Sequence, residues 1–267
     1  MPSVHSTAIV DPKACLDEGV EIGPYCIVGP GAVIGRGTRL IAHVHVTGDV
    51  RIGANNVFYP FCAIGAEPQD LSYDGAPTWV VIGNDNVFRE SCTIHRATTK
   101  EAGVTSVGSN NFLMCGVHLG HDVSLGDHAS IANNTLLAGH CHVQDYVGIS
   151  GGVAIHQFTT VGSYCFIGGV SKIVTDVPPY MLVEGWPTEV RCVNTVGLKR
   201  RGFANNEIRA LAQAHRLIYR MFVPLAEARE QLQQSGEVTP AVANLLSFLE
   251  GQRGGKVGRG REGRRAA

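Results

Sequence analysis

The sequence predicts a parallel β-helix followed by a C-terminal α-helical domain, and three observations support this fold class. Bulky apolar residues recur at every sixth position from Val4 to Ile64 without a miss, and again from Val107 to Ile173. The residue two positions before each of them is mostly small, and the residue after it is often glycine. Beyond Pro178 and Pro179 the six-residue period stops and helical spacing begins. A fixed short period is typical of solenoids, whose units pack only on their neighbours.

Each six-residue unit predicts one short strand and one turn. Positions two residues apart lie on the same side of a strand, so the large and the small residue of one unit both face inward. The glycine that follows suits a turn in which φ must be unrestricted. Three such units close one coil of about 18 residues, and successive coils stack about 4.8 Å apart. The β-helix is expected to span residues 1–191.

The cysteines fit this pattern as structural residues. Five of the eight fall in the small inward position, where a buried thiol serves as a spacer. No two cysteines have the C-x-x-C spacing of zinc ribbons and thioredoxins. We therefore expect no thiol chemistry.

Two segments break the period and are expected to project as loops, near residues 66–81 and 99–106. The first contains Pro68, Gly75 and Pro77, and in the second the register shifts by one residue. Insertions into a solenoid gather on one side and often carry function. These loops are therefore candidates for part of a binding site.

The C-terminal part is expected to form helices over residues 192–252. Apolar residues at helical spacing end at Pro224, and Thr239 followed by Pro240 predicts the start of the last helix. These helices would cover the strand edges at the end of the β-helix. Residues 253–267 hold six basic residues among glycines, so we predict a disordered tail, with binding of an acidic partner as the alternative.

Charge and composition exclude several classes of function. The formal net charge is −1, so the total gives no indication of a nucleic-acid partner. No apolar run reaches the length of about 18 residues that a membrane span needs, and the first residues lack the basic and apolar regions of a leader. We expect a soluble, cytoplasmic protein without stable membrane insertion.

Coil geometry gathers histidines at one corner. Leu119, Leu137 and Ile155 are one coil apart, so they should stack on one wall, and the turns after them should share a corner. A single histidine at an exposed turn is usually tolerated without function, but four at one edge, in a stretch without lysine or arginine, indicate a site. The residues at this corner are His118, His121, Asp122, Gly139, His140, His156 and Gln157.

The chemistry indicated by this corner is acyl transfer. His121 beside Asp122 can act as a proton acceptor near neutral pH. Gly139 lies one coil away and can present its N–H to a developing oxyanion. This pair of functions is what the attack of a hydroxyl on an acyl carbonyl requires.

Two alternatives remain open on the residues alone. Some hexapeptide β-helix proteins hold zinc with three histidines between subunits and act as carbonic anhydrases of the gamma type. Their His-x4-His spacing is absent here, although His140 and His142 face the same side of a strand. We therefore predict no metal site. A scaffold without chemistry is the last alternative.

Seven sequence runs, in this order and with a helical C-terminal domain, carry a resemblance over nearly the whole chain. The runs are Gln69–Leu71, Thr93–Arg96, His118–Asp122, Leu137–His140, His156–Phe158, Asp176–Tyr180 and Gly197–Phe203. They are similar to those of the UDP-N-acetylglucosamine acyltransferases of the first step of lipid A synthesis, the LpxA family. The resemblance implies a left-handed β-helix and a homotrimer whose sites lie between adjacent subunits.

The resemblance also implies a reaction, the transfer of an R-3-hydroxyacyl chain from acyl carrier protein to the 3-hydroxyl of UDP-N-acetylglucosamine. The chain arrives on the phosphopantetheine of the carrier protein, and no other cofactor is expected. By the same resemblance His121 is the general base, Asp122 orients it and Gly139 offers its N–H to the thioester oxygen. Some relatives acylate a 3-amino sugar nucleotide instead, and this acceptor remains an alternative.

Further residues match substrate contacts of that family. Arg200 and Arg201 match residues that hold the nucleotide phosphates, and Asn194 matches a uracil contact. The matches along the cleft are Gln69, Asp70, His118, His140, His156 and Gln157. Val196 stands where the best-known members carry glutamate, and Ser72 where they carry lysine. Gly169 occupies the position that sets acyl length, where glycine leaves room for a long chain, roughly tetradecanoyl.

Overall fold

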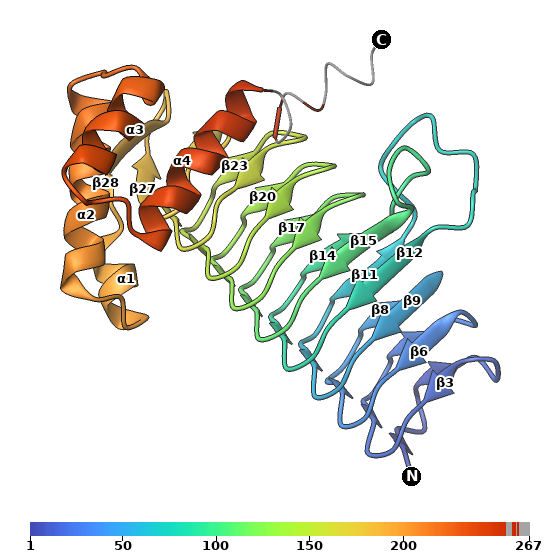
Figure 1. Ribbon diagram of the computed structural model, residues 1–267. Helices are drawn as coiled ribbons and strands as arrows, with labels where there is room; N and C mark the ends of the chain where they lie inside the picture. Colours follow the sequence, from blue (N-terminus) through green and yellow to red (C-terminus); the bar gives the residue numbers. More distant parts are fainter. Residues whose placement is uncertain (255–257, 260, 262–267) are drawn as a thin grey trace.

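The computed structural model describes residues 1–254, 258, 259 and 261, and it contains the expected left-handed parallel β-helix. Three sheets form the walls of a long prism, and each coil adds one strand to each wall (Figure 1). The first wall holds β1 (Ser3–Val4), β4 (Glu21–Ile22), β7 (Arg39–Leu40), β10 (Val57–Phe58), β13 (Val87–Phe88), β16 (Phe112–Leu113), β19 (Ser130–Ile131), β22 (Gly148–Ile149), β25 (Phe166–Ile167), β27 (Met181–Glu184) and β28 (Glu189–Val193).

The other two walls are built in the same way. The second wall holds β2 (Ile9–Val10), β5 (Ile27–Val28), β8 (His45–Val46), β11 (Ala63–Ala66), β14 (Thr93–His95), β17 (His118–Leu119), β20 (Leu136–Leu137), β23 (Ala154–Ile155) and β26 (Lys172–Ile173). The third wall holds β3 (Cys15–Leu16), β6 (Ala32–Ile34), β9 (Asp49–Ile52), β12 (Trp79–Ile82), β15 (Val104–Val107), β18 (Ser124–Leu125), β21 (His142–Val143) and β24 (Thr160–Val161).

The strand register confirms the coil length on which the site prediction depends. Leu119 pairs with Leu137, and Leu137 pairs with Ile155, all on the second wall. Ile94 pairs with Leu119, because an interruption lengthens the coil between them. Side chains one coil apart are therefore direct neighbours in space.

Both interruptions replace the turn between the second and third walls. The first lies between β11 and β12, and the second between β14 and β15. Figure 1 shows them projecting from the same edge of the β-helix. In the next coil this corner holds His121, so the loops stand directly beside the expected site.

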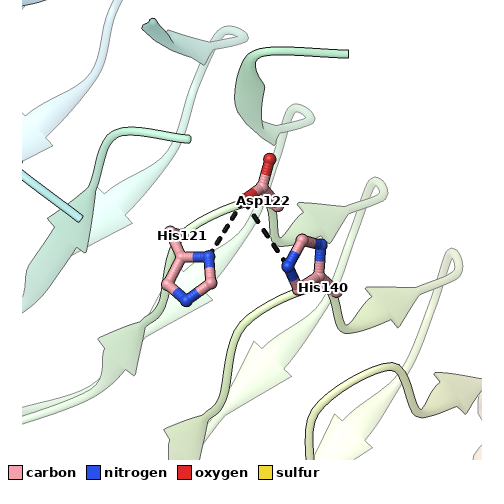
Figure 2. Close-up of side chains that lie close together, drawn as sticks. All are labelled: His121, Asp122 and His140. Atoms are coloured by element: carbon pink, nitrogen blue, oxygen red, sulfur yellow. Dashed lines mark hydrogen bonds and ion pairs between the residues drawn. The ribbon is translucent and has the colours of Figure 1, made fainter. Parts of the chain in front are cut away.

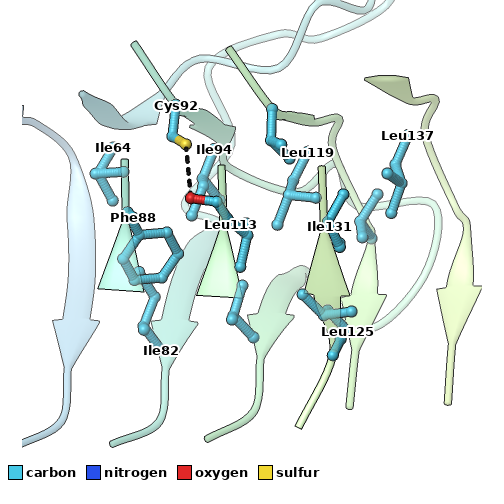
Figure 3. Packing of buried hydrophobic residues seen from close by; sticks show 14 of the residues in the cluster. Ile64, Ile82, Phe88, Cys92, Ile94, Leu113, Leu119, Leu125, Ile131 and Leu137 are labelled. Carbon is cyan, nitrogen blue, oxygen red and sulfur yellow. Dashed lines mark hydrogen bonds between the residues drawn. The ribbon is translucent and has the colours of Figure 1, made fainter. Parts of the chain in front are cut away.

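The core consists of the inward residues of the six-residue units (Figure 3). Large side chains such as Leu119 and Leu137 are fully buried, and the rings of Phe58 and Phe88 stack with centroids 4.5 Å apart. The inward cysteines are buried as expected, and the thiol of Cys92 points at the carbonyl oxygen of Leu113 at 3.8 Å. Burial raises the pKa of Cys141 to about 12, so this thiol stays protonated at neutral pH.

The glycines after the large residues have a different role from the expected one. Of these glycines, all within the described part of the chain, only Gly65 has a positive φ, at 82°. At Gly53 a Cβ would lie 2.5 Å from the carbonyl oxygen of Gly83 in the next coil, so the close approach of stacked corners excludes a side chain. Other residues take the left-handed position of the corners, among them Asp122 (φ 59°) and His140 (φ 62°).

The C-terminal domain covers the end of the β-helix. It begins at β28, which turns back antiparallel to β27, so the boundary expected after residue 191 falls inside a strand. The helices are α1 (Thr195–Arg200), α2 (Asn205–His215), a π-helical segment η1 (Arg216–Arg220), α3 (Leu225–Gln234) and α4 (Pro240–Arg253). Thr239 caps α4 and Pro240 lies in its first turn, as predicted. In the described residues no helix has the length and apolarity to cross a membrane.

Part of the segment expected to be a disordered tail is placed on the molecule. Arg253 is the last residue of α4, and Arg259 and Arg261 hydrogen-bond to histidines of the β-helix. The guanidinium groups of Arg259 and Arg261 have acceptors that the sequence composition does not reveal, and disorder of the tail stays a prediction. Residues 255–257, 260 and 262–267 of the expected tail lie outside the described residues.

Candidate active site

His121 and Asp122 form a hydrogen-bonded pair at the corner after β17 (Figure 2). His121 Nδ1 lies 2.9 Å from Asp122 Oδ2. Because an ionised carboxylate only accepts hydrogen bonds, this contact places the imidazole proton on Nδ1 and leaves the Nε2 lone pair available. His121 also lines a cleft, so its Nε2 is positioned as a base.

Asp122 is held by the second loop and by β15, the strand that follows it. The backbone N–H and the hydroxyl of Thr98 donate to Asp122 Oδ2 at 3.0 and 2.7 Å, and the Asp122 N–H donates to Thr105 Oγ1 at 2.9 Å. Burial, the largest influence, would raise the pKa of Asp122, but the hydrogen bonds from His121 and Thr98 together lower it below its usual value. The carboxylate therefore stays ionised and can stabilise an imidazolium at His121.

His140 forms a second layer behind this pair. Its Nε2 lies 3.8 Å from Asp122 Oδ2, and its ring meets the ring of His121 edge-on with centroids 5.1 Å apart. The other face of His140 stacks on Phe158 at 4.4 Å. Burial lowers the pKa of His140, while the carboxylates of Asp122 and Glu101 oppose this shift. His140 is thus a buried neutral ring rather than a group that lines the cleft.

Gly139 provides the surface against which His121 lies. A Cβ on Gly139 would be 2.5 Å from Cε1 and 2.6 Å from Nε2 of His121, so only glycine permits this packing. Within the described part of the chain, no residue accepts a hydrogen bond from the Gly139 N–H. A backbone donor beside Nε2 can stabilise an oxyanion that forms next to the base.

A cleft of about 460 Å³ runs along the second wall beside these groups. His118, His121, Gly139, Gln69 and Gln157 all line it, as the sequence analysis expected. Apolar residues of the second wall complete the lining of the cleft, namely Leu136, Ala138, Ala154 and Ile155. The cleft therefore combines a base, a backbone donor and an apolar surface.

His118 is a neutral member of this cleft. Burial, with smaller contributions from His95 and His121, lowers the pKa of His118 to about 4. Its Nδ1 lies 2.7 Å from the hydroxyl of Thr93. His118 can therefore hydrogen-bond to a ligand without carrying charge at neutral pH.

Asp70 joins the two loops and does not line the cleft. Lys100 of the second loop pairs with its carboxylate at 2.5 Å, and Ser72 donates two hydrogen bonds to it. These contacts, with that of Lys100 the largest, lower the pKa of Asp70 far below its usual value. Within one chain Asp70 thus fixes the loop that carries Gln69 into the cleft.

His156 is likewise engaged elsewhere. Its Nδ1 accepts a hydrogen bond from Arg259 Nη1 at 2.7 Å, and it is not among the residues that line the cleft. Gln157, its neighbour in sequence, does line the cleft. The structure therefore separates these two predicted substrate contacts.

A second cleft of about 550 Å³ holds the residues matched to a nucleotide site. Asn194, Val196, Arg200 and Arg201 line it together with aromatic residues of the corner between the third and first walls. The guanidinium of Arg201 lies over the ring of Tyr146 at 4.8 Å. One chain therefore does not bring these residues to the His121 cleft, because the two groups lie at different corners of the prism.

Gly169 lies outside both clefts of one chain. It is exposed, and a Cβ there would meet Gly151 O at 3.4 Å and Ser150 Oγ at 3.5 Å, which leaves space beside it. Its part in acyl length stays a prediction.

Several residues of the site were not identified from the sequence. Thr98 lies in the loop where the six-residue period fails, and Thr105 lies in β15, the strand after it, so no spacing connected them with Asp122. Arg259 and Arg261 follow a stretch with no period at all. His95 also lines the cleft, and two signals in the sequence pointed to it: its place in the run Thr93–Arg96 and its position on the same wall as His118.

The donor atoms of His121, Asp122 and His140 lie within 4.8 Å of one another, close enough to be considered as metal ligands. Asp122 Oδ2 already accepts hydrogen bonds from His121 Nδ1 and from Thr98. The group also lacks the third histidine of the zinc alternative. This donor set fits an oriented base better than a metal centre.

Comparison with known families connects this geometry to an activity. The family model described as Udp N-acetylglucosamine O-acyltransferase; Domain 2 matches residues 176–257, and the model of the bacterial transferase hexapeptide matches residues 105–139. The acyl-[acyl-carrier-protein]–UDP-N-acetylglucosamine O-acyltransferase of Thermodesulfovibrio yellowstonii is 45% identical over 96% of this chain and 99% of its own length. The enzyme of the same name from Leptothrix cholodnii is 45% identical over 96% of this chain and 100% of its own.

Solved structures give the same result. LpxA from Acinetobacter baumannii superposes with a TM-score of 0.88 at 42% identity, covering 92% of this chain and 96% of that one. LpxA from Bacteroides fragilis, a UDP-N-acetylglucosamine acyltransferase, superposes with a TM-score of 0.89 at 35% identity with the same coverage. The similarity extends through the β-helix and the helical domain.

Proposed function

The chain belongs to the family of acyl-[acyl-carrier-protein]–UDP-N-acetylglucosamine O-acyltransferases, and we propose that His121 is the general base of its reaction. The substrates are an acyl chain on acyl carrier protein and UDP-N-acetylglucosamine, and the reaction begins lipid A synthesis. The observation that carries the proposal is the Nδ1 contact of His121 with a buried, ionised carboxylate beside an open cleft. The names of the relatives favour a hydroxyl acceptor over a 3-amino acceptor.

Each proton of the reaction has a place in this geometry. His121 Nε2 takes the proton of the sugar hydroxyl, and the oxygen attacks the thioester carbonyl carbon. The carbonyl oxygen becomes an oxyanion that accepts a hydrogen bond from the Gly139 N–H. When the tetrahedral intermediate collapses, the C–S bond breaks and the imidazolium of His121 returns its proton to the leaving sulfur. The products are the acylated sugar nucleotide and the free thiol of the carrier protein.

Asp122 supports both halves of this cycle. Its carboxylate holds the Nδ1 proton, which keeps Nε2 directed into the cleft. It also stabilises the imidazolium that exists between the two proton transfers. Its fixed position, through Thr98 and Thr105, prevents it from rotating away during the reaction.

A homotrimer with shared sites accounts for the two separate clefts. Asn194, Arg200 and Arg201 lie at a different corner from His121, so a neighbouring subunit is needed to bring the nucleotide cleft to the base. Phe112 and Phe166 on the first wall are 36% and 37% exposed in one chain, which suits a wall covered by a partner. In this arrangement Asp70, His156 and Gly169 contact substrate held between subunits.

The remaining expectations follow from the same reaction. Gly169 leaves room for a long hydroxyacyl chain, since its position is open in one chain. No cofactor beyond the phosphopantetheine of the carrier protein takes part. A donor carried on acyl carrier protein also favours a cytoplasmic location.

Replacing His121 by alanine tests the proposal. We expect kcat for acylation of UDP-N-acetylglucosamine by hydroxyacyl carrier protein to fall by about 10²–10⁴-fold, because the base that Asp122 orients is lost. His45→Ala, an exposed histidine on β8 of the same wall, is the matched control and should keep its activity. Activity of His121→Ala within a few-fold of the unaltered protein would remove His121 as the base.

A further inference from the structure

Arg261 returns from the C-terminal segment to the back of the active-site corner. Its Nη2 donates to the carbonyl oxygens of His140 and Phe158 at 2.8 and 3.2 Å. Its Nη1 lies 2.8 Å from Nε2 of His142 and 3.5 Å from a carboxylate oxygen of Glu101. One guanidinium thus joins two successive coils and the second loop.

A column of rings leads from this guanidinium to the base. Arg261 lies over the ring of Phe158 at 5.9 Å, and Phe158 stacks on His140 at 4.4 Å with an angle of 2° between the rings. His140 meets His121 edge-on and approaches the carboxylate of Asp122. Two packed rings, those of Phe158 and His140, therefore connect Arg261 with His121.

We propose that Arg261 is a positioning residue of the active site, which fixes the ring of His140 behind the His121–Asp122 pair and counters the charge of Glu101. The inference rests on the proposed role of His121 as base. Arg261 touches neither the cleft that contains His121 nor any group that reacts. It acts through His140 and Phe158.

The charges around His140 explain why the cation of Arg261 affects the active site. Four titratable groups surround His140. Asp122 and His121 lie in the preceding coil, Glu101 lies in the second loop at 3.5 Å, and His142 lies in β21. Burial opposes protonation of His140 and the two carboxylates favour it. Arg261 pairs with one of these carboxylates, that of Glu101, at 3.5 Å. A protonated His140 would donate to Asp122 Oδ2 and compete with His121 for the carboxylate that supports the base.

The test is the pH dependence of kcat/KM in Arg261→Ala. Without this cation Glu101 acts more strongly on His140, so His140 binds a proton more readily. Protonated His140 then takes the carboxylate of Asp122 from His121, and the support for the base is lost at higher pH. We expect the acid limb of the profile to move to higher pH by about 1 unit. Activity should fall about tenfold on that limb and recover on the alkaline plateau.

Two further variants separate charge from geometry. Arg261→Lys keeps the charge but loses the forked contact with two carbonyl oxygens, so the acid limb should stay while kcat falls. Adding Glu101→Gln to Arg261→Ala removes the opposing charge and should return the limb to its original position. Arg229→Ala is the matched control, because it breaks another arginine–glutamate pair, with Glu250, in the helical domain.

The outcomes distinguish this inference from the proposed function. Equal loss of activity at every pH, with the acid limb unmoved and a lower unfolding temperature, would reduce Arg261 to a structural role. An unchanged profile would show that the contact does not affect the reaction. If the unaltered protein itself fails to acylate UDP-N-acetylglucosamine, the proposed function fails and the Arg261 variants are not needed.

Discussion

At the scale of single residues, the site is organised around one carboxylate oxygen. Asp122 Oδ2 accepts hydrogen bonds from His121 and twice from Thr98, and it lies within reach of His140. Such a concentration of donors keeps a buried carboxylate ionised, which an unpaired buried carboxylate could not be. The positive φ of Asp122 is part of this arrangement, since the left-handed corner sets the direction in which its side chain leaves the backbone.

Gly139→Ala should separate the two functions of this glycine from overall folding. The new Cβ would occupy the space of His121 Nε2, so the base would be displaced and the oxyanion donor covered. We expect kcat to fall by about 10²–10³-fold. Gly151→Ala is the control, because a Cβ there makes only ordinary contact with Asn133 O at 3.4 Å. Near-normal kcat in Gly139→Ala would contradict the assigned geometry.

The low pKa of His118 predicts how stability depends on pH. His118 is neutral in the folded chain down to about pH 4, while an unfolded histidine binds a proton near pH 6.5. Between these values the unfolded state binds more protons, so the free energy of unfolding should decrease as the pH falls from 6.5 towards 4. Urea unfolding at several pH values measures this slope. It should become smaller in His118→Gln and stay the same in His5→Gln, whose side chain is exposed.

At the scale of single elements, the strands are too short to be stable alone. Most have two residues, and each is held by parallel pairing with the coils before and after it and by its inward side chain. Stability therefore comes from stacking, as in other solenoids. The corners allow this stacking because glycine occurs where two coils approach most closely, as at Gly53.

Leu119→Ala measures the contribution of one inward side chain. Leu119 is fully buried on β17, directly before His121, so its truncation should lower the free energy of unfolding by about 2–5 kcal/mol. Leu136→Ala on the adjacent β20 is the control: this side chain is 48% exposed, and its loss should cost less than about 1 kcal/mol. Equal effects of the two substitutions on the free energy of unfolding would show that the inward side chains contribute no more to stability than the outward ones.

At the scale of the whole molecule, the important feature is that one chain holds the predicted site residues at two different corners of the prism. The nucleotide candidates Arg200 and Arg201 follow the β-helix in sequence, and their cleft opens at a different corner from His121. A site shared by neighbouring subunits reconciles these positions. A heterologous contact of this kind closes into a ring when the rotation between subunits is one third of a turn.

Subunit mixing tests the shared site. His121→Ala and Arg201→Ala should each be nearly inactive as pure proteins, since each lacks one part of every site. If the sites lie between subunits, trimers that contain both variants should recover up to about a third of the original activity, because in each of them one site combines two intact halves. Coexpression with two affinity tags isolates such hybrids. Hybrids as inactive as the parents would place both residues in one subunit.

The sequence alone determined the length of the coil and therefore which residues meet at the active-site corner. A strict six-residue period fixes which residues stack, so His121, Asp122 and Gly139 could be brought together before any coordinates. The aperiodic segments gave no such information. Three further sets of contacts depend on how the loops and the terminal segment pack on the prism. They are those of Thr98 and Thr105 with Asp122, of Lys100 with Asp70, and of Arg261 with the backbone of His140. Only the tertiary structure decided these contacts. The spacing of residues in a repeat determines which of them become neighbours, whereas a segment without a repeat acquires its neighbours only when it packs on the rest of the molecule.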